Sequence, residues 1–348
     1  MISRRRYGLG PGAVILILIL ALFLLIVTAT GLGYIRVPPG QVVGIMLSRA
    51  PGGAGLTAGL DDAHRRVVLE VRLPRILTAA AVGAGLALAG VIFQGLLLNP
   101  LADPYTLGVS AGAAFGAALS LLLALDFLGP YTVSLLAFLG ALAALAAVLA
   151  LASRDGRISP TSLILSGVIV AAILSAGLSF IKYAAGEHVS TIIFWLMGSL
   201  VARNWLHAGL TTAATLSGFI LAAFYARDLN IIALGQRTSD SLGVDTRKVR
   251  LTLLAAASFV ASVCVSVSGI IGFVGLIVPH LMRLLVGPDN RVLLPASAAA
   301  GGLLLLAADT VTRTALPHEV PIGVLTALIG GPYFCYLFRR EHMAGAHD

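Results

Sequence analysis

The chain has 348 residues, of which 58% are hydrophobic and only 11% are charged, and its mean hydropathy is +0.99. Soluble domains carry charge on roughly a quarter of their residues, so this composition excludes a soluble protein and predicts an integral membrane protein. The formal net charge of +8 then indicates membrane topology, and it is not a sign of nucleic-acid binding.

The charged residues gather in short clusters between long apolar runs. A helix needs about 20 residues to cross the hydrocarbon core of a bilayer, and the runs do not show the alternation of β-barrel strands. We therefore predict an all-α polytopic membrane protein, with a single transmembrane domain over residues 1–348. About ten transmembrane helices are expected, at residues 12–30, 76–98, 107–125, 131–151, 161–181, 207–225, 251–267, 270–286, 293–310 and 321–338.

The basic residues predict the orientation of these helices. An even number of spans returns both termini to one side, and the positive-inside rule places that side in the cytoplasm. The segments assigned to it hold most of the arginines: Arg4, Arg5, Arg6, Arg154, Arg157, Arg227, Arg237, Arg247, Arg250, Arg291, Arg339 and Arg340.

Two features of the first half concern packing and chain reversal. Gly108, Gly112 and Gly116 repeat every four residues, which predicts a helix face that another backbone can approach closely. The stretch NPLADP at 99–104 places prolines around Asn99 and Asp103, which predicts a rigid turn at the end of the second span.

A polar island, ALGQRTSDSLGVDTRKVR at 233–250, interrupts the apolar sequence. Apolar residues such as Leu234 and Leu242 alternate there with Ser, Thr, Asp and Arg, which predicts one or two short amphipathic helices. Such a segment could be a solvated loop with a helix lying on the membrane, or a surface that binds a partner.

No energy source or catalytic site is evident in the chain. A phosphate-binding loop needs glycines followed by Lys and then Ser or Thr, and neither Lys182 nor Lys248 has that context. If ATP is used, another polypeptide hydrolyses it. An ion-coupled secondary transporter is the alternative, and it would rely on ionisable residues within the spans, here His280, Arg283 and Asp309. We predict no catalytic residue, no metal site and no cofactor. Cys264 and Cys335 lie within apolar runs, where cysteine usually behaves as a small hydrophobic residue.

Several motifs occur in a characteristic order. They are RLPR at 72–75, FQGLLLNPLADPYTLGVSAGA at 93–113, FWLMGSL at 194–200, ALGQRTSDSLGV from 233, GIIGFVGLIVPHLMRLLVGPDNRVLLP at 269–295, ADTVTR at 308–313 and PIGVLTALIGGPYF from 321. Together they closely resemble the FecCD-type permeases of binding-protein-dependent ABC importers, of the type II architecture, over residues 65 to 340. Members of that family take up ferric siderophores, haem and cobalamin.

The resemblance implies the assembly and its location. The chain would be a transport subunit without enzymatic activity, working as a homodimer in the inner (cytoplasmic) membrane with both termini cytoplasmic. Its partners would be two copies of an ABC ATPase subunit, a periplasmic or lipid-anchored substrate-binding protein and membrane lipid, but no nucleic acid. The substrate itself, and the role of the insertion at 49–66, do not follow from these motifs.

The resemblance also implies three sets of site residues. Cytoplasmic coupling helices would occupy residues 228–249 and dock on the ATPase, with Gly235 and Gly243 as turns, through Ala233, Leu234, Gly235, Gln236, Ser241, Leu242, Gly243 and Val244. Arg72, Arg75 and Arg313 would bind glutamates of the binding protein, although long basic side chains also anchor helices at the membrane interface. We expect Asp309 to pair with Arg313 on the same helical face.

The third set is a cytoplasmic gate at the start of the fifth span. It would comprise Ser159, Thr161 and Ser162, whose small hydroxyl side chains suit a constriction that opens. Ser and Thr are also common N-caps of helices, so capping is the other interpretation of this triplet.

Overall fold

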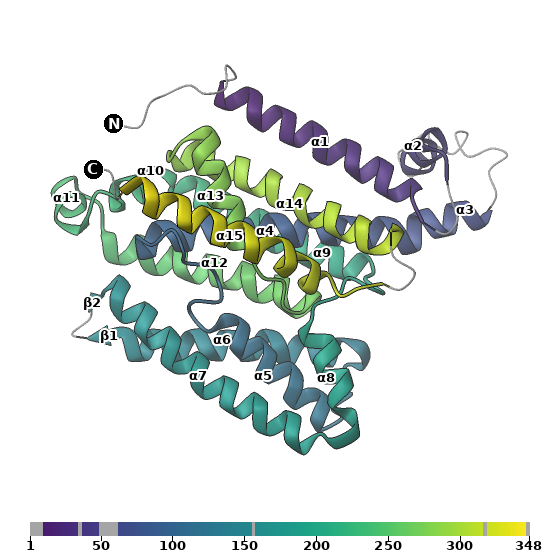
Figure 1. The fold of residues 1–348 in the computed structure, drawn as a ribbon, viewed down its shortest axis with the longest axis horizontal. Coiled ribbons are helices and arrows are strands. Elements are labelled where there is room, and N and C mark those ends of the chain that lie inside the picture. The colour runs from purple at the N-terminus through teal and green to yellow at the C-terminus, as the bar shows by residue number, and fades with distance from the viewer. Residues whose placement is uncertain (1–9, 34–36, 49–61, 155–156, 316–318, 346–348) are drawn as a thin grey trace.

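The computed structural model describes residues 10–33, 37–48, 62–154, 157–315 and 319–345 (Figure 1). Within them the chain is almost entirely helical, and a two-residue antiparallel pair, β1 (Ser153–Arg154) with β2 (Arg157–Ile158), closes one turn. The longer helices are α1 (Pro11–Gly31), α4 (Leu73–Leu97), α5 (Val109–Leu122), α6 (Thr132–Ala152), α7 (Pro160–Ala184), α9 (Trp205–Phe224), α12 (Thr246–Ser268), α13 (Val274–Val286), α14 (Asn290–Thr314) and α15 (Ile322–Gly345).

Short helices join the long ones at both ends of the bundle. They are α2 (Pro39–Leu47), α3 (Asp62–Arg66) with the π-helical turn η2 (Val67–Arg72), the 3-10 turns η3 (Gly129–Tyr131) and η4 (Gly186–His188), α8 (Val189–Leu196), α10 (Ala226–Ile232) and α11 (Gln236–Ser241). In Figure 1, α10, α11 and the strands β1 and β2 lie at one end of the bundle, and α2 and α3 lie at the other. Most of the insertion, residues 49–61, falls outside the described residues.

Each predicted span overlaps one of the longer helices, although in α5, α13 and α15 the apolar stretch is short. Among the described residues, seven helical segments are long and apolar enough to cross a bilayer: Pro11–Gly31, Asp62–Leu97, Gly129–Ala152, Pro160–Ala184, Trp205–Phe224, Thr246–Ser268 and Asn290–Thr314. The apolar helices Val109–Leu122, Val274–Val286 and Ile322–Tyr336 fall short of that length. The protein is thus an all-α, multi-pass membrane protein, and the count of ten spans stays a prediction.

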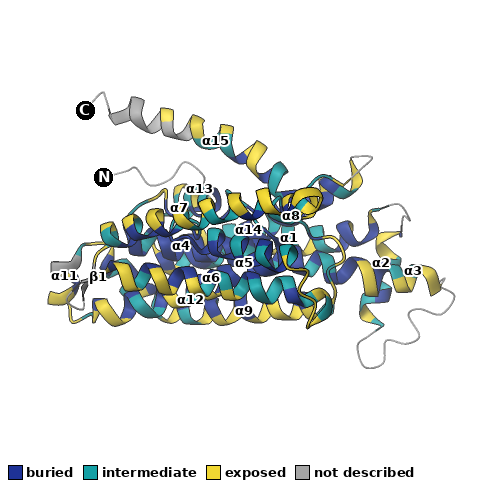
Figure 2. Cartoon of the chain, turned by 90° about the horizontal axis from the view of Figure 1, so that it is seen from below, coloured by how far each residue is buried: buried dark blue, intermediate teal, exposed yellow. Residues whose placement is uncertain are grey.

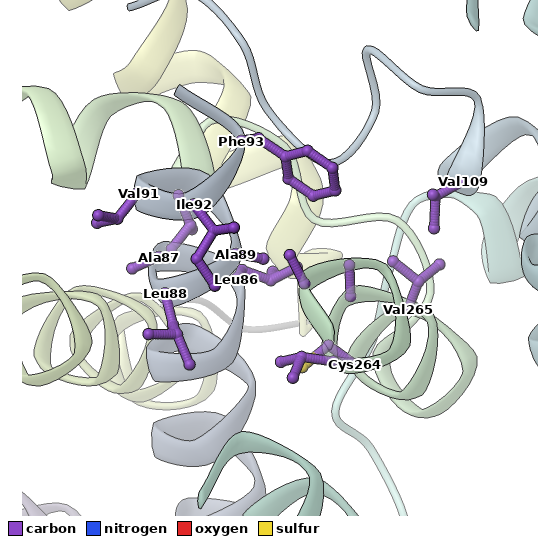
Figure 3. Packing of buried hydrophobic residues seen from close by; sticks show 14 of the residues in the cluster. Leu86, Ala87, Leu88, Ala89, Val91, Ile92, Phe93, Val109, Cys264 and Val265 are labelled. Atoms are coloured by element: carbon purple, nitrogen blue, oxygen red, sulfur yellow. The ribbon is translucent and has the colours of Figure 1, made fainter. Parts of the chain in front are cut away.

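Helix α4 forms the centre of the bundle. Side chains along it, such as Leu86, Ile92 and Phe93, are almost fully buried and face Cys264 and Val265 of α12 (Figure 3). Helices α9, α12, α13 and α14 surround it, and Figure 2 shows its buried surface inside a shell of exposed helices. The apolar outer surface suits a lipid environment, where packing rather than exclusion of water holds helices together.

Glycines let the central helices touch backbone to backbone. A Cβ placed on Gly83 of α4 would lie 2.2 Å from the carbonyl oxygen of Gly301 on α14, and one on Gly301 would lie 2.4 Å from that of Gly83. In the second layer, Gly112 and Gly116 of α5 meet the backbone of α6 at Gly140 and Leu136 in the same way. The close approach expected for the glycine repeat is confirmed for these two, whereas Gly108 precedes α5 with a φ of +72°.

The predicted eighth span begins later than expected. The sequence pattern starts a helix at residue 270, but Gly269 and Phe273 have φ of +70° and +68°, so α13 begins only at Val274. This irregular segment packs against two others, since added Cβ atoms on Gly198 and Gly323 would lie 2.6 and 2.5 Å from the carbonyl oxygen of Ile270. At its start, the N–H of Gly269 donates to the carbonyl oxygen of Val265 at 2.8 Å, and the Gly269 carbonyl oxygen accepts from the Ser268 hydroxyl at 3.1 Å.

The NPLADP turn holds that irregular segment from the other side. Asp103 Oδ1 accepts hydrogen bonds from the backbone N–H groups of Tyr105 at 3.1 Å and Thr106 at 2.9 Å, which fixes the turn. The Tyr105 hydroxyl then donates to the carbonyl oxygen of Ile271 and accepts from its N–H. Burial raises the pKa of Asp103 above its usual value, against the lowering effect of these hydrogen bonds. The turn is therefore a structural element, as its prolines predict.

Candidate functional site

The polar island folds into short helices separated by glycine turns. Helix α10 ends at Ile232, α11 runs from Gln236 to Ser241, and α12 begins at Thr246. Gly235 and Gly243 flank α11 with φ of +99° and +78°, a conformation that glycine adopts without steric cost. Nothing lies within 4 Å of a Cβ placed on either glycine, so backbone conformation alone explains glycine there.

Polar bonds hold α11 in place from its inner side. The buried hydroxyl of Ser239 donates to the carbonyl oxygens of Ile231 at 3.0 Å and Gly235 at 2.9 Å. Thr246 Oγ1 donates to Asp240 Oδ1 at 3.0 Å, which ties α11 to the first turn of α12. The segment is therefore anchored on both sides.

The apolar residues beside α11 face outward. Leu234 and Leu242 are 64% and 59% exposed, and they lie at the helical turns on either side of α11. Ala233, Ser241 and Gly243 are exposed as well, while Val244 packs partly against the core. The side chain of Gln236 lies outside the described residues. We call Leu234, Leu242 and α11 the coupling surface.

At the other end of the bundle, the predicted docking arginines lie near one another and are bonded within the chain. Arg75 of α4 donates from Nε and Nη2 to Asp309 Oδ1 of α14, at 3.0 and 2.8 Å. Its Nη1 donates to Glu319 Oε1 at 3.1 Å. The side chain of Asp309 is only 1% exposed, whereas that of Glu319 is 42% exposed, so Arg75 joins one buried and one accessible carboxylate.

Arg72 and Arg313 bind the C-terminal turn of α1. Arg72 Nη1 donates to the carbonyl oxygens of Thr30 and Gly31, at 3.0 and 3.3 Å. Arg313 donates to the carbonyl oxygens of Leu32 at 2.9 Å and Ala29 at 2.7 Å. The last carbonyls of a helix have no partner within the helix and carry partial negative charge, so two guanidinium groups stabilise this end. We call Arg72, Arg75, Arg313, Asp309 and Glu319 the arginine cluster.

One expected pair is wrong. The four-residue spacing predicts an ion pair between Asp309 and Arg313, but the Asp309 carboxylate bonds Arg75 instead. Arg313 turns to the carbonyls of α1, which helical spacing alone does not reveal. Nearby Arg203 is half-buried, and desolvation first and the charge of Arg75 second lower the pKa of its guanidinium.

A small cavity opens beside the arginine cluster. Its volume is about 220 Å³, and its lining includes Arg75, Phe194, Ser199, Asp309 and Glu319. Sites for drug-sized ligands measure about 300–1,000 Å³, so this cavity is too small for a metal chelate or a corrinoid. It lies beside the charged side chains of the arginine cluster.

The three predicted gate residues begin α7. Ser159 Oγ accepts from the backbone N–H of Ser162 at 3.0 Å and lies 2.8 Å from the hydroxyl oxygen of Ser162. This is the N-cap arrangement, so the capping interpretation has direct support from the geometry. Thr161 is exposed on the first turn of the same helix. The gating role stays a prediction.

Sequence reasoning missed the partners of the site residues. Glu319 received no role, and neither did Asn230, whose side chain joins α10 to the start of α14. For the contact of Asn230 with Asp289 and Asn290, the sequence signal is the GPDN turn at 287–290, which lies within the motif at 269–295. In the part of the chain that the structure describes, no three His, Cys, Asp or Glu residues gather into a group that could hold a metal ion.

Comparison with known proteins identifies the family. The model of the FecCD transport family matches residues 17–340. The chain is 45% identical to the cobalamin import system permease protein BtuC of Halobacterium salinarum, over 83% of this chain and 78% of the relative. It is 40% identical to the hemin transport system permease protein HmuU of Yersinia pestis, over 81% and 85% of the two chains.

A solved structure shares the fold as well. An inward-facing metal-chelate type ABC transporter matches with a TM-score of 0.82 and 33% identity, covering 94% of this chain and 99% of the other. The family match spans nearly the whole chain, and the helical architecture agrees with it. The protein therefore belongs to the FecCD transport family and is a multi-pass permease subunit of an ABC importer.

Proposed function

We propose that this permease carries an iron chelate, either a ferric siderophore or haem, or cobalamin into the cytoplasm. In this proposal it works as a homodimer in the inner membrane, with two copies of a separate ATPase subunit and a periplasmic or lipid-anchored binding protein. The names of its relatives support the substrate class, since one is a cobalamin permease and another a hemin permease. The end of the bundle that carries α11 faces the cytoplasm, which is the side that the arginine distribution favours.

The observation that carries this proposal is the exposed coupling surface. Leu234 and Leu242 leave most of their area uncovered, although Ser239 and Asp240 hold the intervening helix firmly in place. An anchored helix with apolar side chains on its outer face suits insertion into a groove of a partner. The ATPase subunit is that partner, and closure of its nucleotide sites would move α11 as a rigid piece.

The arginine cluster is the proposed docking site for the binding protein. In the part of the chain that the structure describes, Arg75 lies near Arg203 and Arg313 and bonds Asp309 and Glu319, and the surplus of guanidinium groups favours a negatively charged partner. Glu319 is the accessible partner of Arg75. A glutamate of the binding protein can therefore take the place of Glu319 on the guanidinium of Arg75 without disturbing buried Asp309.

The path for the substrate would run beside α7, with Ser159, Thr161 and Ser162 at its cytoplasmic gate. The exposed faces of α7, which include Ile173 and Phe180, are compatible with contacts to lipid or to a second copy of the chain. Opening of the gate would break the Ser159–Ser162 cap and fray the first turn of α7.

The ion-coupled alternative has less support. It needs an ionisable group that can bind and release a cation along the path. Asp309 is held by Arg75 at 2.8 Å, within the last turns of α14, so its charge is already compensated at one end of the bundle. An ion-coupled carrier would also have no use for an exposed, anchored α11.

Assembly with the ATPase tests the proposal. The double variant Leu234→Asp with Leu242→Asp should fold normally and lose most of its ATPase subunit during co-purification, because two carboxylates would enter an apolar groove. Phe127→Asp is the matched control, since Phe127 is 62% exposed in the α5–α6 connection. Equal recovery of the ATPase with wild-type and doubly substituted permease would refute the coupling surface.

A further inference from the structure

Asn230 makes an unusually complete set of hydrogen bonds for a side chain on a seven-residue surface helix. Its Nδ2 donates to Asp289 Oδ1 at 2.7 Å, and its Oδ1 accepts from Asn290 Nδ2 at 2.7 Å and from the N–H of Asn290 at 2.9 Å. These bonds join α10 to the turn before α14, 59 and 60 residues away in sequence. We call Asn230, Asp289 and Asn290 the clasp.

The α14 side of the clasp is itself fixed. Asp289 Oδ1 also accepts from the N–H of Arg291 at 3.0 Å, which caps α14, and Asn290 is only 6% exposed. The pKa of Asp289 lies below its usual value, mainly because its carboxylate accepts the hydrogen bond from the N–H of Arg291 and secondly because it accepts the one from the amide of Asn230. These bonds favour the carboxylate form of Asp289, and a hydrogen bond to a charged oxygen is stronger than one between neutral groups.

The residue before Asn230 joins α10 to α4. Leu229 is fully buried, and its Cδ1 would lie 2.9 Å from a Cβ on Gly95, so the absence of a side chain at Gly95 makes room for it. Neighbouring residues of α10 therefore contact the two central helices, Leu229 by packing against α4 and Asn230 by hydrogen bonds to the start of α14.

Helices α4 and α14 form a pair that is joined along its length. Their backbones touch at Gly83 and Gly301, and the buried ion pair of Arg75 with Asp309 joins them at the far end. Close-packed helices of this kind move as units, because their interface does not deform continuously. A displacement applied to α10 can thus reach the arginine cluster through this pair.

We propose that Asn230 is a positioning residue that makes α11, α10 and the α4–α14 pair move as one body during the transport cycle. This inference rests on the proposed role of α11 as the coupling surface. Without the clasp, a push on α11 would tilt α10 about Leu229 and leave α14 behind. The clasp thus decides whether ATPase closure is transmitted to the bundle.

The test measures the distance between α11 and α14 in two states of the transporter. Nitroxide labels are placed on Thr238→Cys, an exposed position of α11 outside the predicted docking residues, and on exposed Val311→Cys, in a Cys335→Ser background. Only labelled permease that still binds the ATPase subunit is measured. The two labels are separated by most of the length of α14, about 30 Å, which is within the range of double electron–electron resonance spectroscopy. The permease–ATPase complex is measured without nucleotide and after trapping with ATP and vanadate.

With the clasp intact, the distance should stay the same in both states. Asn230→Asp places a carboxylate against Asp289, so the distance should change by about 2 Å or more on trapping. Adding Asp289→Asn exchanges the amide and the carboxylate, so the new amide can donate to the new carboxylate, which still accepts both bonds from Asn290. Asparagine also remains a good N-cap for α14. The double variant should therefore return to a constant distance.

Arg227→Ala on the exposed face of α10 is the matched control and should behave like the wild type. A distance that changes in the wild type, or that stays constant in Asn230→Asp, would overturn the clasp while leaving the proposed function intact. Failure of the wild-type permease to form an ATPase complex would overturn the proposed function itself and the clasp with it.

Discussion

The candidate functional residues at the two ends of the bundle differ in whether their own chain already satisfies them. At the coupling surface, Leu234 and Leu242 are left uncovered around a helix that is firmly anchored. In the arginine cluster, Arg72, Arg75 and Arg313 already bond carbonyls and carboxylates of their own chain. This difference fits the proposed assembly, in which the ATPase subunit would cover the first region permanently and the binding protein would dock transiently on the second.

The difference has a physical reason. Exposed apolar area at a membrane protein's aqueous end is unfavourable until a partner covers it, so it suits a subunit that stays bound. A guanidinium group buried without a partner would be far more costly, which is a physical reason for the arginines to bond their own chain. If the proposed docking is right, exposed Glu319 is the group that a carboxylate of the binding protein would replace.

The largest expected effect concerns the arginine cluster. Arg75→Gln should destabilise the protein by about 3–5 kcal/mol, because it leaves the buried carboxylate of Asp309 without its cation. Thermal denaturation of the detergent-solubilised permease measures the change. Adding Asp309→Asn should recover most of the loss, and a single variant as stable as the wild type would show that the pair is not structural.

The next effect concerns the turn before α11. Gly235→Ala should cost about 1–2 kcal/mol, because φ of +99° is unfavourable for a residue with a Cβ although the space is open. Gly209→Ala is the control, since Gly209 lies within α9 and also has open space around its Cβ position. If both substitutions change the melting temperature alike, the positive φ is not the reason for glycine at 235.

A smaller effect would show what anchors the coupling surface. Ser239→Ala removes two hydrogen bonds to backbone carbonyls and should cost about 1 kcal/mol. Amide hydrogen exchange in α11 should accelerate, while exchange in α12 stays unchanged. Thr238→Ala, on the exposed side of the same helix, should leave both rates unaltered; acceleration there too would mean that α11 frays for other reasons.

The smallest effect depends on pH. The pKa of Asp289 lies below its ordinary value of 3.8, so its contribution to stability is present above that value and is lost as pH falls through the lowered one. Between pH 5 and the acid limit of about 3, the wild type should therefore lose more stability than Asp289→Asn. Parallel pH profiles of the two proteins would contradict a charged Asp289 in the clasp.

The sequence predicted the helices well because long apolar runs determine them directly. Each expected span overlaps a helix, and the glycines around α11 take the turns expected of them. Hydropathy could not show that residues 269–273 are irregular, since they are as apolar as the helix that follows. It also gave no sign of α8, which is too short to stand out in an apolar stretch.

The arrangement around the arginines could not be read from one sequence. Arg75 and Asp309 are 234 residues apart, and their contact depends on how α4 and α14 pack. Local spacing favoured Asp309 with Arg313, but Arg313 donates instead to the carbonyl oxygens of Ala29 and Leu32 at the end of α1. The clasp of Asn230 is hidden for the same reason, since its partners lie in another motif.

Uptake into proteoliposomes tests the central claim most directly, namely that a separate ATPase powers this permease through the coupling surface. Permease and ATPase subunit are reconstituted together, hemin or cyanocobalamin is supplied on the cognate binding protein, and MgATP and the ion gradients are varied independently. The account predicts accumulation that requires ATP hydrolysis and persists after ionophores have dissipated every gradient. Accumulation driven by an ion gradient, with the permease alone and no nucleotide, would contradict it.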